Sequence, residues 1–308
     1  MKQKLNSSTN VEHSTETAIT PNPCYVPCGL ELNKIYNESN LDTMKRMPDN
    51  FVDLTVTSPP YDDLRTYNGY CFDFENVAKE LFRVTKQGGV VVWVVNDKTQ
   101  NGSESGTSFR QALYLISCGF RLHDTMIWEK KNPIPNDPRQ NRYIQATEYM
   151  FVFSKNAPKT CNYITEPCLM AGVDAGTGTA RKQNGDIRTD RKEKRKGKVV
   201  KDVKPLTNVW RYSNGTIYKK HPASFPEQLA NDHIISWSNE NDLIYDPFMG
   251  SGTTAKMAIV NNRKYIGSEI SEDYCKIIET RIKECGGLFF NFFQTELSND
   301  SRNVAACV

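Results

Sequence analysis

The residues best suited to chemistry are the five from Thr57 to Tyr61, Thr-Ser-Pro-Pro-Tyr, which directly follow the apolar run 51–56. A β-rich run that stops at two prolines predicts a strand followed by an extended loop, because proline lacks a backbone donor and fixes its own φ. The residue before a proline is also held extended, so the carbonyls of Ser58 and Pro59 can point away from the sheet. With the Ser58 hydroxyl and the flat Tyr61 ring, these acceptors suit a planar ring that carries an exocyclic amino group. The alternative interpretation is an ordinary proline-broken turn.

A second candidate is the glycine-rich segment 246–254, Asp-Pro-Phe-Met-Gly-Ser-Gly-Thr-Thr, between a predicted strand and a predicted helix. Glycines at alternate positions let the backbone turn tightly and approach a ligand, and the helix start offers N–H groups to it. A phosphate-binding loop requires a lysine where Thr253 stands, and a dinucleotide fingerprint requires a third glycine. The expected ligand is therefore nucleoside-like without a triphosphate. Glu269, which ends the next predicted strand, is placed to accept hydrogen bonds from both hydroxyls of a ribose.

The elements that must position these residues alternate between strands and helices. The apolar run 90–95 is typical of a strand covered on both faces, and Gly88 and Gly89 are expected to end the helix before it. Together the elements predict an α/β fold with a mostly parallel sheet and helices on both faces. Strands are predicted at 33–36, 51–57, 90–95, 120–128, 147–153, 243–246 and 265–268, and helices at 41–47, 74–86, 108–117, 226–238, 253–261 and 272–285.

The chain of 308 residues has room for one large catalytic domain with an inserted or appended module. Periodicity fades after about residue 154, and residues 181–204 contain 11 Lys and Arg against 4 Asp and Glu. A basic segment in a chain of net charge +3 predicts local contact with a polyanion, with a nucleic-acid backbone as the first candidate. The alternative is a solvated, disordered run of charges.

Composition also excludes several classes of protein. No apolar run approaches the length of a membrane span, and the N-terminus lacks the regions of a signal peptide. Nine scattered cysteines indicate reduced thiols in the cytoplasm, not a disulfide framework. Cys24 and Cys28 have no second pair or His cluster at zinc-ligand spacing, so no metal is expected. Residues 1–30 and 291–308 are expected to be disordered tails.

The chain resembles the β group of the S-adenosylmethionine-dependent DNA amino-methyltransferases. Segment 57–61 is similar to the catalytic motif of that family, and segment 246–254 is similar to its cofactor motif. His-Pro-Ala-Ser-Phe-Pro at 221–226 is similar to a third motif, at the methionine end of the cofactor. The resemblance covers about residues 33–285. The catalytic motif, a variable region and then the cofactor motifs follow in the order of a circularly permuted class I methyltransferase fold.

That resemblance implies a seven-stranded, mostly parallel sheet and an inserted target-recognition module. It implies a catalytic half at 31–154, a target-recognition region at 155–216 and a cofactor-binding half at 217–290.

It also implies roles for individual residues. Ser58 and the Pro59 carbonyl bind the target amino group, and Tyr61 stacks on a base that has been flipped out of the duplex. An acid usually contacts the cofactor adenine near Glu38, but Ser39 occupies the expected position. The implied catalytic residues are Ser58, Pro59, Pro60 and Tyr61. The implied cofactor-binding residues are Asp246, Pro247, Phe248, Gly250, Gly252 and Thr253, with Glu269 on the ribose, His221, Pro222 and Ser224 over the methionine, and Glu38 or Ser39 on the adenine. The DNA-binding candidates are Arg181, Arg188, Arg191 and Lys192.

The implied activity is methyl transfer from S-adenosylmethionine to the N4 amino group of a cytosine in double-stranded DNA, in a restriction–modification system with a partner endonuclease. Ser at the first motif position is typical of N4-cytosine enzymes and Asp of N6-adenine enzymes, so adenine is the alternative base. A cytosine-C5 enzyme is rejected because its Pro-Cys-Gln motif is absent. Two further alternatives are an inactive DNA-binding protein on the same scaffold and an RNA or protein amide substrate, for which related enzymes carry Asn-Pro-Pro-Tyr.

Overall fold

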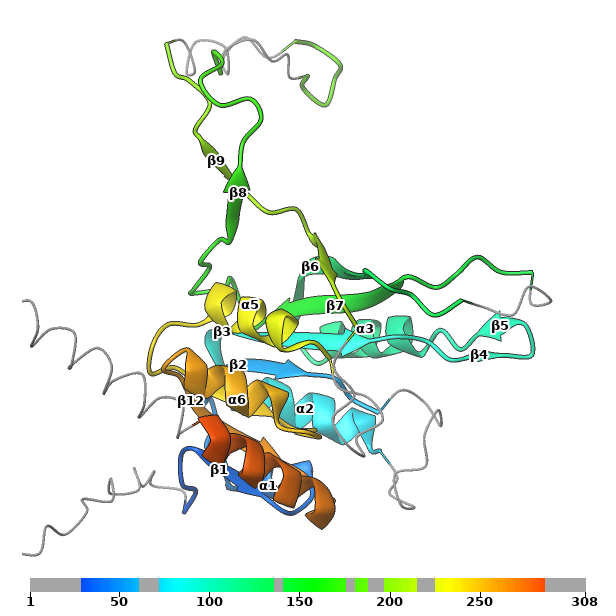
Figure 1. Ribbon diagram of the computed structural model, residues 1–308, viewed down its shortest axis with the longest axis vertical. Coiled ribbons are helices and arrows are strands. Elements are labelled where there is room, and N and C mark those ends of the chain that lie inside the picture. Colours follow the sequence, from blue (N-terminus) through cyan, green and yellow to red (C-terminus); the bar gives the residue numbers. More distant parts are fainter. Residues whose placement is uncertain are drawn as a thin grey trace, which may run out of the picture.

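The computed structural model describes residues 29–60, 72–135, 141–175, 181–187, 197–214 and 225–285. They form a body built around one large sheet, and an arm that projects from the body (Figure 1). The strands of the large sheet are β1 (Lys34–Tyr36), β2 (Val52–Thr57), β3 (Thr85–Val95), β6 (Arg121–Lys130), β7 (Thr147–Ser154), β10 (Val209–Tyr212), β11 (Leu243–Asp246) and β12 (Lys264–Ser268). The helices are α1 (Asn40–Arg46), α2 (Phe74–Val84), α3 (Thr107–Ser117), α5 (Glu227–Trp237), α6 (Thr253–Val260) and a final helix, residues 272–285.

The order of strands across the sheet is β1-β12-β11-β2-β3-β7-β6-β10. Strand β7 pairs antiparallel with β3 and β6, and the other neighbouring pairs are parallel. The prediction of a mostly parallel α/β sheet is therefore confirmed. This order places β2, which carries the proline loop, between β3 and β11.

Helices cover both faces of the sheet, because successive side chains of β3 pack against helices on opposite faces. Val90, Val92 and Val94 pack on the face covered by α5, α6 and the final helix. Val91, Trp93 and Val95 pack on the opposite face, against α1, α2 and α3. Figure 1 shows α5 and α6 side by side on the near face. Burial on both faces explains why the run 90–95 is continuously apolar.

The structure corrects three details of the sequence prediction. The sheet has eight strands and not seven, because β10 pairs with β6. Its Trp210 and Tyr212 are buried, but four residues are too few for a clear alternating pattern. Helix α2 ends at Val84 and not at the two glycines, which lie inside β3. Leu30, assigned to the N-terminal tail, is fully buried in the core.

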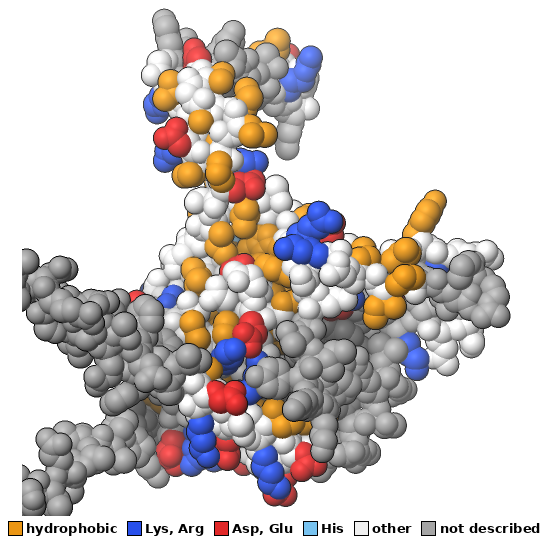
Figure 2. All heavy atoms as spheres, in the orientation of Figure 1, with side chains coloured by type: hydrophobic (Ala, Val, Ile, Leu, Met, Phe, Trp, Pro, Cys, Tyr) orange, Lys and Arg blue, Asp and Glu red, His pale blue; other side chains and the backbone are white. Residues whose placement is uncertain are grey.

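The arm, made of the described residues 165–175, 181–187 and 197–205, lies within the predicted target-recognition region. Its base is a hairpin of β8 (Thr165–Pro167) and β9 (Val203–Pro205), where Glu166 and Lys204 form an ion pair of 3.0 Å. Figure 2 shows basic and apolar side chains mixed on the described surface of the arm, where Leu169 is 98% exposed. No helix in the described part of the chain is both long and apolar enough to cross a membrane.

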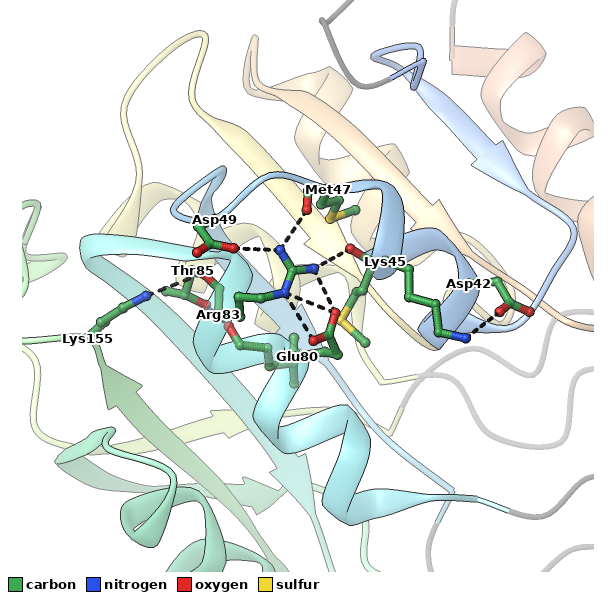
Figure 3. Close-up of polar contacts among 10 residues, drawn as sticks. Asp42, Lys45, Met47, Asp49, Glu80, Arg83, Thr85 and Lys155 are labelled. Atoms are coloured by element: carbon green, nitrogen blue, oxygen red, sulfur yellow. Dashed lines mark hydrogen bonds and ion pairs between the residues drawn. The ribbon is translucent and has the colours of Figure 1, made fainter.

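Arg83 of α2 joins the first two helices (Figure 3). Its guanidinium donates to the carbonyls of Met44 at 2.7 Å and Met47 at 2.8 Å, at the end of α1, and pairs with Glu80 at 2.7 Å. The last carbonyls of a helix lack partners within the helix, so Arg83 caps α1 from the side. This contact holds the C-terminal end of α1 against α2.

Candidate active site

The candidate site lies where the carboxyl ends of neighbouring parallel strands meet, the usual ligand-binding edge of an open α/β sheet. Tyr245 of β11 pairs with Thr55 of β2, so the two strands end side by side. The loop after β2, which begins Ser58-Pro59-Pro60, therefore starts next to the loop after β11, residues 247–252. In this way the fold joins two motifs that are far apart in the sequence.

Asp246 is the centre of this junction. One carboxylate oxygen accepts hydrogen bonds from the Thr57 hydroxyl at 2.6 Å and the Phe248 N–H at 3.0 Å. The other accepts from the Thr254 hydroxyl at 2.7 Å. Asp246 is 1% exposed, and this burial raises its pKa to about 6, although the three hydrogen bonds oppose the shift. The carboxyl group thus joins the end of β2 to the glycine-rich segment 246–254 and to the start of α6.

As the sequence predicted, β2 ends at Thr57 and the two prolines follow outside the strand. Ser58 and Pro60 are half-buried and Pro59 is buried, directly beyond Thr57. Tyr61, the fourth predicted catalytic residue, lies outside the described residues. The other predicted site residues outside the described part of the chain are His221, Pro222, Ser224, Arg188, Arg191 and Lys192.

The glycine-rich loop has a backbone that side chains would disturb. Gly250 has φ of 55° and Gly252 has φ of 81°, in the left-handed region that glycine tolerates best. A Cβ on Gly252 would lie 2.9 Å from a methyl carbon of Ile278 in the final helix. The loop therefore turns tightly against that helix and leads directly into Thr253, the buried first residue of α6.

Glu269 closes this loop on the side of β12. Its two oxygens accept hydrogen bonds from the N–H groups of Gly250 and Ser271, each at 2.8 Å. The side chain is only 8% exposed, and burial raises its pKa despite these bonds. Each oxygen keeps a lone pair that can accept from a ribose hydroxyl.

Glu38 and Ser39 have local partners. Glu38 forms an ion pair with Arg46 and accepts from the Thr43 hydroxyl at 2.7 Å, so its carboxylate is held by α1. Ser39 caps α1 and accepts from the Leu41 N–H at 3.3 Å. Both side chains therefore have a structural role at the start of α1.

Two asparagines that sequence analysis missed connect the turn between β1 and α1 to the candidate site by hydrogen bonds. Asn37 donates to the Glu269 carbonyl at 2.9 Å, and Asn40 donates to the Pro247 carbonyl at 3.2 Å. No motif marks them, and their only signal is their place in the turn after a predicted strand.

A cavity of about 560 Å³ opens on the other side of β2, beyond the carboxyl end of β3. Among its lining residues, Gln145 donates to Asn96 at 3.1 Å and Arg142 pairs with Glu104 at 3.0 Å. The Tyr143 ring is fully exposed. The cavity is lined by Asn96, Asp97, Thr99, Glu104, Asn141, Arg142, Tyr143, Gln145, Thr147 and Tyr149. Its size is that of a small-molecule site, and the proline loop starts between it and the cofactor motif.

A family model of N6 and N4 DNA methylases matches residues 52–280, most of the described chain. The chain belongs to this family. It is 56% identical over 241 residues to the orphan methyltransferase M.BamHII of Bacillus amyloliquefaciens, an alignment that covers 75% of this chain and 89% of the relative. It is 27% identical over 266 residues to the Type II methyltransferase M.BglII of Bacillus subtilis, covering 83% and 71% of the two chains.

Solved structures show the same fold. The PvuII DNA methyltransferase (cytosine-N4-specific) matches with a TM-score of 0.60 at 20% identity, covering 80% of this chain and 85% of that one. The complex of M1.HpyAVI with S-adenosylmethionine matches with a TM-score of 0.53 at 22% identity, covering 81% and 98%. The methyl donor of this methylase is S-adenosylmethionine. The tight glycine loop and the buried Glu269 carboxylate fit a nucleoside with a small charged tail and no phosphates.

Proposed function

We propose that this methylase modifies the N4 amino group of cytosine in double-stranded DNA. The observation that carries the proposal is the position of Ser58-Pro59-Pro60, at the end of the strand that pairs with the cofactor-motif strand β11. Ser at the first motif position favours cytosine over adenine. The chain order, with the catalytic motif before the cofactor motif, is that of the permuted β group.

S-adenosylmethionine supplies a methyl group on a positively charged sulfonium centre. The amino group of cytosine is a poor nucleophile because its lone pair is delocalised into the ring. We propose that the Ser58 hydroxyl and the Pro59 carbonyl accept hydrogen bonds from the two N–H groups of the amine, which draws the nitrogen towards tetrahedral geometry. The prolines fix these acceptors in advance, so the catalytic contribution is positioning and electrostatic stabilisation.

The cofactor is proposed to lie across the loops after β11 and β12. Glu269 then accepts from the ribose hydroxyls, and residues 246–253 face the methionine end together with His221, Pro222 and Ser224. The described chain before and after the segment that contains His221, Pro222 and Ser224 is consistent with this proposed placement. It leaves the end of β10, where the Tyr212 carbonyl accepts from the Lys131 N–H at 2.8 Å, and it resumes at Phe225, two residues before α5 begins at Glu227.

The DNA is proposed to contact the arm and the cavity beyond β3. Arginines and lysines between 181 and 204 are suited to bind phosphates, and the cavity at the end of β3, the strand next to β2, offers room for a flipped nucleotide. Tyr61 stacks on the flipped base in this scheme. We propose that the reaction takes place in the cytoplasm, in a restriction–modification system whose endonuclease recognises the same DNA sequence.

The test is to identify the modified nucleoside. DNA from cells that express the enzyme is digested to nucleosides and analysed by mass spectrometry, with cells expressing S58A as the matched control. We expect N4-methylcytosine in the first sample only. S58A should bind S-adenosylmethionine normally and lose on the order of 10²–10³-fold in turnover, as when one catalytic hydrogen bond is removed. N6-methyladenine would identify the alternative base, and no methylated nucleoside from an enzyme that binds the cofactor would favour an inactive scaffold.

A further inference from the structure

Arg281, in the final helix, contacts the glycine-rich loop although it belongs to no motif of the sequence. The residue is 3% exposed, and one guanidinium nitrogen donates to the carbonyl oxygen of Ser251 and, at 2.9 Å, to its hydroxyl. Ser251 is the central residue of Gly-Ser-Gly at 250–252. A buried arginine is retained when its donors have fixed partners, and here one of these is the loop backbone itself.

The charge of Arg281 is balanced by Glu227. The second terminal nitrogen of the guanidinium donates to Glu227 at 2.7 Å, and Lys256 of α6 donates to the same carboxylate at 2.7 Å and 2.8 Å. Burial opposes ionisation of Glu227, but the hydrogen bonds and charges of Lys256 and Arg281 outweigh it and lower its pKa. The carboxylate is therefore ionised at neutral pH, between two cations.

These contacts connect two segments assigned to the methionine end of the cofactor. Glu227 is the first residue of α5 and directly follows the 221–226 segment. Ser251 lies between the two left-handed glycines. The preceding residue, Gly250, is held by Glu269, which accepts from its N–H at 2.8 Å. Two side chains thus fix the glycine loop: Glu269, which is suited to contact the cofactor, binds Gly250, and Arg281 binds Ser251.

We propose that Arg281 is a positioning residue for S-adenosylmethionine. It holds the carbonyl of Ser251 so that the loop keeps its tight turn, and through Glu227 it sets the distance between this loop and the start of α5. The inference rests on the proposed cofactor site and is independent of which base is methylated. It predicts that Arg281 governs affinity for the cofactor, with little effect on DNA binding or on turnover at saturating cofactor.

The test compares R281M and R281K with K276M, a matched control in the same helix whose lysine is exposed and pairs with Glu272 one turn away. Binding of S-adenosylmethionine is measured by calorimetry without DNA, well below the melting temperature of each variant. R281M should weaken binding by about tenfold, the loss expected for a charge-assisted hydrogen bond, and raise KM for the cofactor by a similar factor. Turnover at saturation should change less than about twofold on the same argument.

R281K should recover part of the affinity, because a lysine can donate to Ser251 or to Glu227 but lacks the planar guanidinium that donates to both at once. K276M should bind like the wild type. If R281M melts earlier but binds the cofactor normally, Arg281 is only structural and the proposal is overturned. The variant E269Q tests the proposed cofactor site separately from the role of Arg281. If E269Q loses cofactor binding and R281M keeps it, the proposed site is supported and the role of Arg281 is refuted. If both variants bind the cofactor normally, the proposed site itself is refuted.

Discussion

The Thr57 hydroxyl donates a hydrogen bond of 2.6 Å to the carboxylate of Asp246, across 189 residues of sequence. Thr57 is the last residue of β2 and directly precedes Ser58, while Asp246 is the last residue of β11 and opens the cofactor motif. The contact is fully buried, and the two loops leave the sheet from it in adjacent positions. The distance between the proposed methyl acceptor and donor sites is thus fixed at the base of both loops.

Replacing Thr57 should loosen this junction. T57V keeps the shape and strand preference of threonine but leaves the buried carboxylate one donor short, so we expect a loss of about 1–3 kcal/mol in the free energy of unfolding. Urea denaturation measures the loss, and T57S, which keeps the hydroxyl, is the control. A variant as stable as the wild type would show that the hydrogen bond contributes nothing to the junction.

Asp246 should make stability depend on pH. Its pKa is raised from 3.8 to about 6 in the folded protein, so between these values the folded state binds more protons than the unfolded state. The free energy of unfolding should therefore fall as pH rises through this window, by up to about 3 kcal/mol for this group. The measurement is the difference in unfolding free energy between wild type and D246N from pH 4 to pH 8. A difference that stays constant across the range would contradict the raised pKa.

Gly252 and Gly102, which both have a left-handed backbone, offer a matched pair of substitutions. Their φ values are 81° and 78°, but a Cβ would strike Ile278 at the first and meet nothing within 4 Å at the second. G102A should cost about 1–2 kcal/mol for the backbone alone, whereas G252A should cost about 1–3 kcal/mol more from the clash and lose cofactor binding. Thermal unfolding and calorimetry test both variants. Equal losses would mean that the contact with the final helix is not tight.

The basic segment of the chain should contribute to DNA affinity alone. Neutralising Arg188, Arg191 and Lys192 should weaken binding to duplex DNA and reduce its salt dependence, by a slope of about 0.9 for each lost phosphate contact. Affinity for S-adenosylmethionine should hold. The control neutralises three exposed lysines of the body, Lys45, Lys276 and Lys283. An equal fall in cofactor affinity would refute this division of labour between the two regions.

The sequence by itself determined the local geometry of both motifs. Two prolines end β2 after Thr57, and the glycines of 250–252 form the turn that precedes the helix starting at Thr253. Proline restricts the backbone and glycine frees it wherever they occur in a chain. The continuous apolar run of β3 likewise predicted a strand covered on both faces. Such features depend on neighbours within a few positions and can be read without a structure.

Only the tertiary structure decided which distant side chains meet. The bond from Thr57 to Asp246 exists because β2 and β11 are neighbours in the sheet, and the anchor of Arg281 on Ser251 exists because the final helix packs behind the glycine loop. The eighth strand, β10, is likewise defined by its pairing with β6 and by Trp210 packing beneath α5. Each contact depends on the pairing and packing of the whole chain, which no short stretch of sequence encodes.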